Sequence, residues 1–253
     1  MADIISSEKQ KRRGSAGFRI FLLSLIPIIV FSVGFIPTII TVKLLLYVIH
    51  FNRLIDFILL PFLITLELLL LLVSEMFISG FFIRIFHITY KTGTYDYNYK
   101  NNTAFKWMLF CQLYTPIRKI LEIVPMGQIK TAYMRLIGMK IGTHSLVGGV
   151  IKDPCMTEFG DNTTMGEYAV IYAHIHDYDK ETITIQKVTI GNNCVVGAGA
   201  IIMPGVTMQD HSVVGAGALV PKNRVLEKNK IYVGNPAKEL SVEPKKQEEA
   251  NNL

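Results

Sequence analysis

The stretch IGNNCVVGAGAIIMPGVTM, residues 190–208, repeats one pattern every six residues. An aliphatic or other apolar residue opens each step, and glycine or another small residue recurs at fixed positions behind it. A step of this length holds one short strand and one turn, and three steps close a triangular coil of about 18 residues. One coil cannot bury its own faces, so neighbouring coils must stack. The pattern therefore predicts a solenoid of short strands.

The same phase holds on both sides of this stretch. The twelve first positions are Ile141, Val147, Asp153, Phe159, Met165, Ile171, Ile190, Val196, Ile202, Met208, Val214 and Val220, and Asp153 is the one that is not apolar. Seven glycines and two prolines occupy the twelve positions that follow them, well above average usage. We expect the first positions to point inward, where each buried aliphatic side chain contributes roughly 1.5–3 kcal/mol.

With this phase, IGTHSLVGG (141–149), FGDNTTMGEYAVI (159–171), VVGAGALVPKN (213–223) and VGNPAKEL (233–240) resemble the hexapeptide-repeat acyltransferases. The resemblance covers residues 141–240. It implies a mainly β fold, a left-handed parallel β-helix, which assembles as a homotrimer. The segments 127–142 and 151–166 also resemble the acyltransferase-like C-terminal region of poly-lysine-type nonribosomal peptide synthetases.

The rhythm stops within YAHIHDYDKETITIQKVTIG, residues 172–191. In the maltose and galactoside O-acetyltransferases, which this region resembles, an excursion here carries the catalytic histidine. The register from Ile171 and Tyr172 implies that His176 is the general base and that Asp179 accompanies it. His174 is the alternative base. An imidazole, with a pKa near ~6.5, suits proton transfer near neutral pH. The sequence leaves open whether Asp177, Asp179 or Glu167 orients the ring.

The resemblance also implies a co-substrate, acetyl-CoA or another acyl-CoA. By alignment, the CoA-binding positions are Ala198, Ala216, Pro221, Lys222 and Lys238. His-x-His is also a zinc-binding spacing, and the gamma-class carbonic anhydrases share this fold, but no third histidine is suitably placed. No metal is predicted, and His144 and His211 are expected to face outward without a catalytic role.

Two apolar segments precede the repeat. Residues 20–42 contain 23 positions without a charge, long enough at ~1.5 Å per residue to cross a ~30 Å hydrocarbon core. Residues 57–82 are interrupted by Glu67 and Glu75, but their apolar side chains outweigh the cost of the acids. We therefore predict a two-helix transmembrane hairpin. Glu67 has two interpretations. It is a functional intramembrane acid, or it has no function and is either protonated or hydrogen-bonded to a neighbouring helix.

The basic residues Lys9, Lys11, Arg12 and Arg13 predict a cytoplasmic N-terminus. Two spans then return the chain to the cytoplasm, although Lys43 and Arg53 in the connecting loop favour the opposite orientation. The predicted location is the cytoplasmic membrane, with the lipid bilayer as a partner and the repeat domain facing the cytoplasm.

The segment between hairpin and repeat mixes aromatic, aliphatic and basic residues. We expect a helix over 104–114 capped by Asn102 or Thr103, a second from Pro116 to near Pro125, and a third over 128–137 that ends at Gly138. The first helix carries Trp107. It is either an amphipathic helix at the membrane interface or a helix packed on the repeat domain.

Charge and cysteine content argue against two classes of protein, nucleic-acid binders and disulfide-stabilised domains. Residues 141–253 carry ten Lys and Arg against thirteen acids, so a nucleic-acid partner is not expected. Three cysteines without a paired spacing predict no disulfide framework. The predicted units are a basic N-terminus (1–17), the hairpin (18–86), the connector (87–140), the β-helix (141–240) and a disordered tail (241–253).

These features predict an enzyme, a membrane-anchored O- or N-acyltransferase. It would move an acetyl or other acyl group from acyl-CoA to a hydroxyl or amine of a sugar, lipid-linked or peptide acceptor. The alternatives are a non-catalytic, membrane-tethered trimeric scaffold, or an amide-forming enzyme that uses a carrier-bound thioester.

Overall fold

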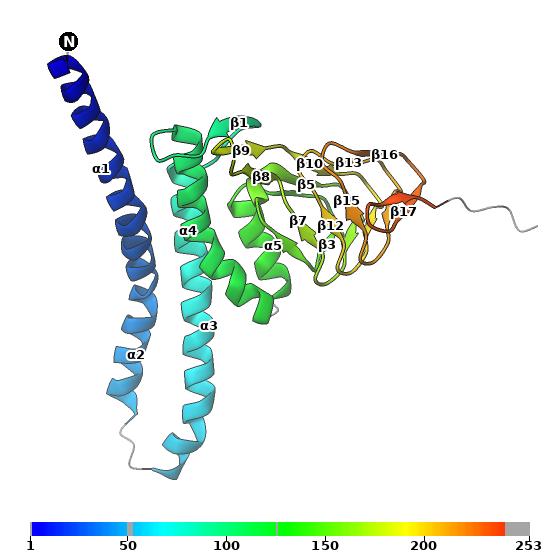
Figure 1. The fold of residues 1–253 in the computed structure, drawn as a ribbon. Coiled ribbons are helices and arrows are strands. Elements are labelled where there is room, and N and C mark those ends of the chain that lie inside the picture. The colour runs from blue at the N-terminus through cyan, green and yellow to red at the C-terminus, as the bar shows by residue number, and fades with distance from the viewer. Residues whose placement is uncertain (1, 50–52, 125, 241–253) are drawn as a thin grey trace, which may run out of the picture.

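The computed structural model of the chain describes residues 2–49, 53–124 and 126–240. A hairpin of long helices comes first, a helical connector follows, and a tapering solenoid of short strands extends sideways from the connector (Figure 1). The predicted tail, 241–253, lies outside the described residues.

Three parallel sheets form the sides of the solenoid. The first contains β2 (Lys140–Ile141), β5 (Thr157–Phe159), β10 (Val188–Ile190), β13 (Thr207–Met208) and β16 (Val225–Leu226). The second contains β3 (Leu146–Val147), β6 (Thr164–Met165), β11 (Val195–Val196), β14 (Val213–Val214) and β17 (Ile231–Val233), with β18 (Lys238–Glu239) added antiparallel at its edge. The third contains β4 (Val150–Ile151), β7 (Val170–Ile171), β12 (Ile201–Ile202) and β15 (Leu219–Val220). The predicted β-helix of hexapeptide repeats is therefore confirmed.

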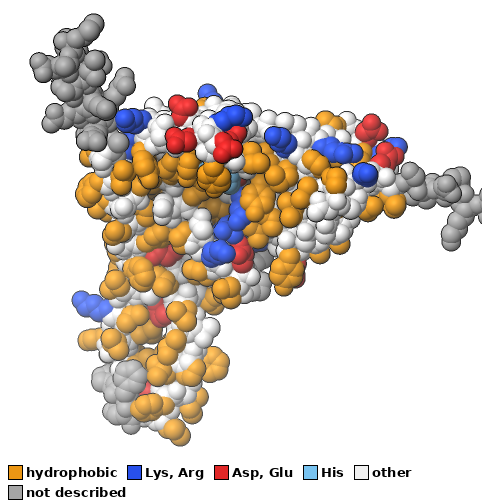
Figure 2. All heavy atoms as spheres, viewed as in Figure 1, with side chains coloured by type: hydrophobic (Ala, Val, Ile, Leu, Met, Phe, Trp, Pro, Cys, Tyr) orange, Lys and Arg blue, Asp and Glu red, His pale blue; other side chains and the backbone are white. Residues whose placement is uncertain are grey.

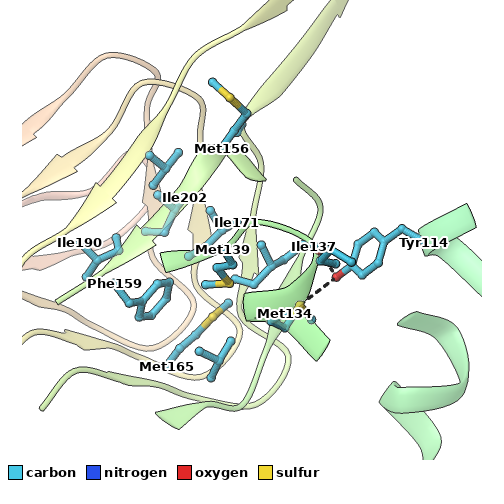
Figure 3. Close-up of a cluster of buried hydrophobic side chains, with 14 of the residues drawn as sticks. Tyr114, Met134, Ile137, Met139, Met156, Phe159, Met165, Ile171, Ile190 and Ile202 are labelled. Atoms are coloured by element: carbon cyan, nitrogen blue, oxygen red, sulfur yellow. Dashed lines mark hydrogen bonds between the residues drawn. The ribbon is translucent and has the colours of Figure 1, made fainter. Parts of the chain in front are cut away.

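The interior of the β-helix is a column of apolar side chains. Ile190, Val196 and Ile202 are at most 1% exposed, and Phe159 and Met165 stack on the same column. Figure 3 shows this column, with Met134, Ile137 and Met139 against its N-terminal end. The expectation for the first positions was wrong at one place. Ile151, rather than Asp153, pairs with Ile171 in the third sheet, because the coil after β3 reaches its next strand two residues early.

The corners of the coils explain two residue preferences. A Cβ on Gly197 would lie 2.4 Å from the backbone nitrogen of Ala216 on the next coil, so glycine is required there by close approach of two backbones. At the corner between the first and second sheets, His144, Asn162, Asn193, His211 and Asn229 all adopt positive φ angles. Asparagine and histidine are enriched in this conformation. His144 and His211 are thus exposed turn residues.

The hairpin consists of α1 (Ala2–Gly34), α2 (Ile36–Val48) and α3 (Leu54–Ile85). Residues Gly17–Val48 and Leu54–Ile85 are long and apolar enough, by length and composition alone, to cross a membrane. Figure 2 shows hydrophobic side chains over much of the hairpin surface. The Thr41 hydroxyl donates a hydrogen bond to Glu67 at 2.8 Å, so Glu67 does bond to a neighbouring helix.

The connector differs from expectation in four ways. One helix, α4 (Asn102–Ile123), runs through Pro116, where two helices were predicted. Its cap is Asn101, which accepts from the N–H groups of Thr103 and Ala104, and not the expected Asn102 or Thr103, which lie inside the helix. Trp107 is only 8% exposed, so this face of α4 packs inside the protein and the interfacial alternative is wrong for it. A strand that the sequence did not predict, β1 (Gly93–Asp96), precedes α4.

The predicted third helix is present as α5 (Gly127–Leu136). Gly138, two residues after it, has a φ of 104°, a conformation that favours glycine at the C-terminal end of a helix. The Tyr114 hydroxyl donates to the carbonyl of Ile151 at 2.8 Å. Through α4 and α5, the connector therefore packs against the first coils of the β-helix.

Candidate active site

The β-helix departs from its six-residue step at one corner on two adjacent coils. Residues 152–156 link β4 to β5 and include the short 3-10 helix Pro154–Met156, while residues 172–187 link β7 to β10. Because β4 pairs with β7 and β5 pairs with β10, these two links lie side by side. The longer link forms a hairpin of β8 (His174–Asp177) and β9 (Thr182–Ile185), and β1 of the connector pairs with β9.

Asp153 lies at the centre of this corner and is fully buried. Its Oδ2 lies 2.6 Å from Nδ1 of His174 and accepts a hydrogen bond from the N–H of Ala173 at 3.1 Å. Its Oδ1 accepts from the hydroxyl of Tyr90 at 2.8 Å and from Nε1–H of Trp107 at 3.1 Å. Both carboxylate oxygens are thus satisfied, by groups from the coil, the long link and the connector.

The charge state of Asp153 follows from these contacts. Burial on its own would raise the pKa of the carboxyl group. The hydrogen bond from His174, the positive charge that this ring carries when it is protonated, and the hydrogen bonds from Tyr90 and Ala173 together outweigh burial, so the pKa lies below its ordinary value. Burial and the nearby carboxylate raise the pKa of Tyr90 well above its ordinary value. An ionised Asp153 therefore faces a neutral tyrosine that donates to it.

His174 has the arrangement of a general base held by a carboxylate. Its Nδ1 faces ionised Asp153, which selects the tautomer that carries the proton on Nδ1 and leaves a lone pair on Nε2. The side chain is 15% exposed, and Nε2 makes no hydrogen bond to any residue that the structure describes. A nitrogen of this kind can accept a proton, and the carboxylate stabilises the imidazolium that results.

His176, the base implied by the sequence register, lies in a different environment. Its ring centroid is 4.5 Å from that of Tyr97, 5.1 Å from Trp107 and 5.5 Å from His174, and Tyr178 stacks on it at 5.8 Å. Its Nδ1 is buried without a hydrogen-bond partner. Burial, followed by the charge of His174, lowers its pKa, and Asp153 only partly opposes this. His176 is therefore held as a neutral ring.

Among the described residues, none of the three acids considered for orienting the imidazole forms a hydrogen bond or an ion pair with either ring. Asp177 instead pairs with Lys180 at 3.1 Å. Asp179 lies in the exposed turn between β8 and β9, and Glu167 is exposed at a different corner. The acid that does pair is Asp153, and the sequence carried a signal for it, since it was the one polar residue among twelve apolar positions. Nothing in the repeat pointed to Tyr90 or Trp107.

The residues predicted to bind CoA fall into three places. Ala198 and Ala216 are exposed on successive coils at the corner after the second sheet, and the carbonyl of Ala198 accepts from the N–H of Gly217 at 2.9 Å. Pro221 and Lys222 follow β15, at the same corner from which the two irregular links depart. Lys238 lies on β18 at the edge of the second sheet. The two corners flank the third sheet.

The described residues were also compared with what a metal site or a cysteine nucleophile would require. Within 2–49, 53–124 and 126–240, no group of three His, Cys, Asp or Glu side chains is arranged to hold a metal ion. All three cysteines are free thiols. Burial raises the pKa of Cys155 to about 12 and raises that of Cys111 as well, so neither is an activated nucleophile.

Comparisons with known proteins agree with the repeat. Residues 187–222 match the family model described as bacterial transferase hexapeptide (six repeats). A Dictyostelium discoideum protein that bears the name of an acetyltransferase is 42% identical over 106 residues. That match covers 40% of this chain and 55% of the relative, so the chain spans about half the length of the curated relative it matches.

Solved structures resemble the same part of the chain. A maltose O-acetyltransferase from Clostridium difficile is 23% identical, covers 49% of this chain and 83% of its own, and superposes with a TM-score of 0.41. A hexapeptide-repeat acetyltransferase from Vibrio cholerae, solved in complex with acetyl coenzyme A, is 19% identical, covers 48% of this chain and 81% of its own, and gives a TM-score of 0.40. Likenesses at this level bear on neither substrate nor site residues. The identification rests on the repeat itself: the C-terminal part of the chain is a β-helix of the hexapeptide repeats found in bacterial transferases.

Proposed function

We propose that the chain is a membrane-anchored acyltransferase that moves an acetyl or other acyl group from acyl-CoA to a hydroxyl or amine. One observation carries this proposal. In a column of transferase-type repeats, two irregular links at the same corner bring an ionised Asp153 to 2.6 Å from His174. A buried charge costs free energy unless it is paired. A β-helix that served only as a scaffold would not need a buried carboxylate. The named acetyltransferase relative from Dictyostelium discoideum supports the same class of reaction.

In the proposed reaction, His174 acts as the general base through Nε2. It takes the proton of the acceptor hydroxyl or amine while that oxygen or nitrogen attacks the carbonyl carbon of the thioester. The tetrahedral intermediate then breaks its carbon–sulfur bond, and the imidazolium returns the proton to the leaving thiolate. Asp153 holds the ring by Nδ1 and stabilises its positive charge. General-base assistance of this kind typically contributes ~10²–10⁴-fold.

The two histidines receive different roles in this proposal. Sequence register favours His176 as the base, but the carboxylate contact belongs to His174. His176 is neutral and lies 5.5 Å from His174 between ring centroids. A neutral imidazole can donate a hydrogen bond to developing negative charge. We therefore assign His176 the role of donating a hydrogen bond to the oxyanion of the intermediate, while the rings of Tyr97 and Tyr178 hold its ring in place.

For the acyl-CoA, the proposed track is the third sheet and the two corners that flank it. Small side chains at Ala198 and Ala216 leave room for the pantetheine arm along the coil edge. Lys222 and Lys238 are exposed, and a lysine complements a phosphate as a point charge. Pro221 would complete the contact surface next to the irregular links. The proposed donor is acetyl-CoA or a related acyl-CoA.

The hairpin is proposed to anchor the enzyme in the cytoplasmic membrane, with both ends of the hairpin on the cytoplasmic side. Arg84 lies in the last turn of the second apolar helix, and Lys91, Lys100 and Lys106 follow that helix within a short stretch, against one acid, Asp96. Such an excess of basic residues favours the cytoplasmic side. Anchoring suits a sugar, lipid-linked or peptide acceptor held near the membrane. The left-handed winding and the homotrimer implied by the resemblance belong to the same proposal.

The test is transfer of radiolabelled acetyl groups from acetyl-CoA by the full chain in nanodiscs, with CoA release measured in parallel. We expect His174→Ala to lower the rate by at least ~10²-fold, and His176→Gln, which keeps a side-chain N–H donor, to lose less than His176→Ala. His144→Ala is the matched control, because His144 is an exposed turn residue of the same β-helix.

Three results would contradict the proposal. Equal rates for wild type and His174→Ala with a strong loss in His176→Ala would return the base to His176. No acetyl transfer or CoA release with hydroxyl and amine acceptors would favour the scaffold. Transfer only from a carrier-bound thioester would favour the amide-forming alternative.

A further inference from the structure

A cavity of about 660 Å³ lies between the hairpin and the connector, outside the candidate active site. This volume is in the range of small-molecule sites. Its apolar walls include side chains from three helices and from the residue after one of them: Phe18, Leu22 and Ile26 of α1, Phe82 of α3 and Phe86 just after it, and Phe105 of α4.

The polar part of the cavity is entirely basic or neutral. Arg19, Lys91 and Lys106 line it, and no Asp or Glu does so in the part of the chain that the structure describes. Arg19 is already engaged, since it donates to the carbonyls of Tyr99 and Lys100 and to Asn102. Lys106 donates once, to the carbonyl of His87 at 3.0 Å. The side chain of Lys91 makes no hydrogen bond or ion pair to any described residue, whereas its carbonyl accepts from the Tyr95 hydroxyl at 3.2 Å.

We propose that this cavity binds an anionic lipid, with a phosphate at Lys91 and Lys106 and an alkyl chain along the apolar walls. Walls that combine apolar side chains with cations, and that include no acid among the described residues, complement a molecule with a hydrocarbon chain and an anionic head. Phe18 and Phe86, at 63% and 61% exposure, are available to a chain that enters from the bilayer. Basic side chains beside a membrane segment attract anionic lipids. The inference takes the membrane attachment proposed above, but it does not depend on acyl transfer.

Tyr90 connects this cavity to the candidate active site. It lines the cavity, and its hydroxyl donates to Oδ1 of Asp153 at 2.8 Å. A lipid in the cavity therefore contacts a residue that holds the active-site carboxylate. The phosphate has two sources, a membrane phospholipid or a polyisoprenyl phosphate of the kind that carries acceptors.

The experiment uses the full chain in phosphatidylcholine nanodiscs that contain an equal fraction of either phosphatidylglycerol or a polyisoprenyl phosphate. Native mass spectrometry counts the lipids that stay bound after release from the nanodisc. We expect wild type to retain one anionic lipid in preference to phosphatidylcholine. The double variant Lys91→Ala/Lys106→Ala should retain it at least ~10-fold less, and Leu22→Trp, which fills the cavity without changing charge, should lose it as well.

Lys119→Ala is the matched control, because Lys119 is a basic residue of α4 that does not line the cavity. It should retain the lipid as wild type does. Retention of phosphatidylglycerol identifies a membrane phospholipid, and retention of the polyisoprenyl phosphate alone identifies a lipid carrier. Release of both at the same rate as phosphatidylcholine, or an equal loss in Lys119→Ala, would overturn the proposal. Since mass is the readout, this result is separate from whether acyl transfer occurs.

Discussion

His174 Nδ1 lies 2.6 Å from Asp153 Oδ2, although 21 positions separate the two residues in the chain. The contact arises because consecutive coils both depart from the regular step at the same corner. Asp153 also accepts hydrogen bonds from Tyr90 and Trp107 of the connector. The same carboxylate therefore orients the histidine and joins the helical part of the protein to the β-helix.

Replacing the carboxylate by an amide tests the pair directly. In Asp153→Asn the negative charge that stabilises the imidazolium is lost, so we expect kcat to fall by ~10²–10⁴-fold with little change in KM for acetyl-CoA. Steady-state kinetics on the full chain measure this. Asp177→Asn is the control, because Asp177 pairs with Lys180 instead. A loss of equal size in both variants would argue against a specific role for Asp153.

Removing the tyrosine hydroxyl tests the link to the connector. In Tyr90→Phe, Oδ1 of Asp153 keeps only the hydrogen bond from Trp107, and we expect the free energy of unfolding to fall by about 1–3 kcal/mol. Thermal and denaturant unfolding followed by circular dichroism measure the change. Tyr178→Phe, at a residue that is 81% exposed, should leave stability unchanged. If Tyr90→Phe were equally neutral, the hydrogen bond would contribute nothing to folding.

The buried histidine predicts a pH dependence of stability. Burial lowers the pKa of His176 below its ordinary value of 6.5, so the unfolded chain binds this proton more readily than the folded chain. Stability should therefore fall as the pH drops below about 6.5 towards the folded-state pKa, and this group should have no effect at higher pH. His176→Gln should flatten that part of the profile. His144→Gln, at an exposed turn, should leave it as in wild type.

Close approach of neighbouring coils predicts a steric effect at one glycine. In Gly197→Ala the new Cβ would lie 2.4 Å from the backbone nitrogen of Ala216, so the two coils must move apart. We expect a loss of about 1–3 kcal/mol in the free energy of unfolding. Ala198→Ser, at the exposed neighbouring position, provides the control. A neutral Gly197→Ala would show that the two coils can move apart at this corner without loss of stability.

The repeat region could be predicted in detail because its structure is local and periodic. An apolar residue every six positions determines which side chains enter the column, and the observed burial of Ile190, Val196 and Ile202 follows that period. The hairpin helices were also predictable, since a long uncharged run has few other stable structures. The prediction failed where the period fails: Ile151 takes the place expected for Asp153. It also failed at Pro116, which packing keeps inside one helix.

The sequence predicted which residues stand out at the candidate site, but not how they pair. The sequence alone determined that the column is interrupted once at two histidines and that one apolar position holds an aspartate. Only the tertiary structure decided that Asp153 pairs with His174 rather than His176, and that Tyr90 and Trp107 complete its hydrogen bonds. A repeat period specifies which residues face inward within a coil. It carries no information on which side chains of neighbouring coils and of a distant helix meet at a corner, because those contacts depend on how the coils stack and where the connector packs.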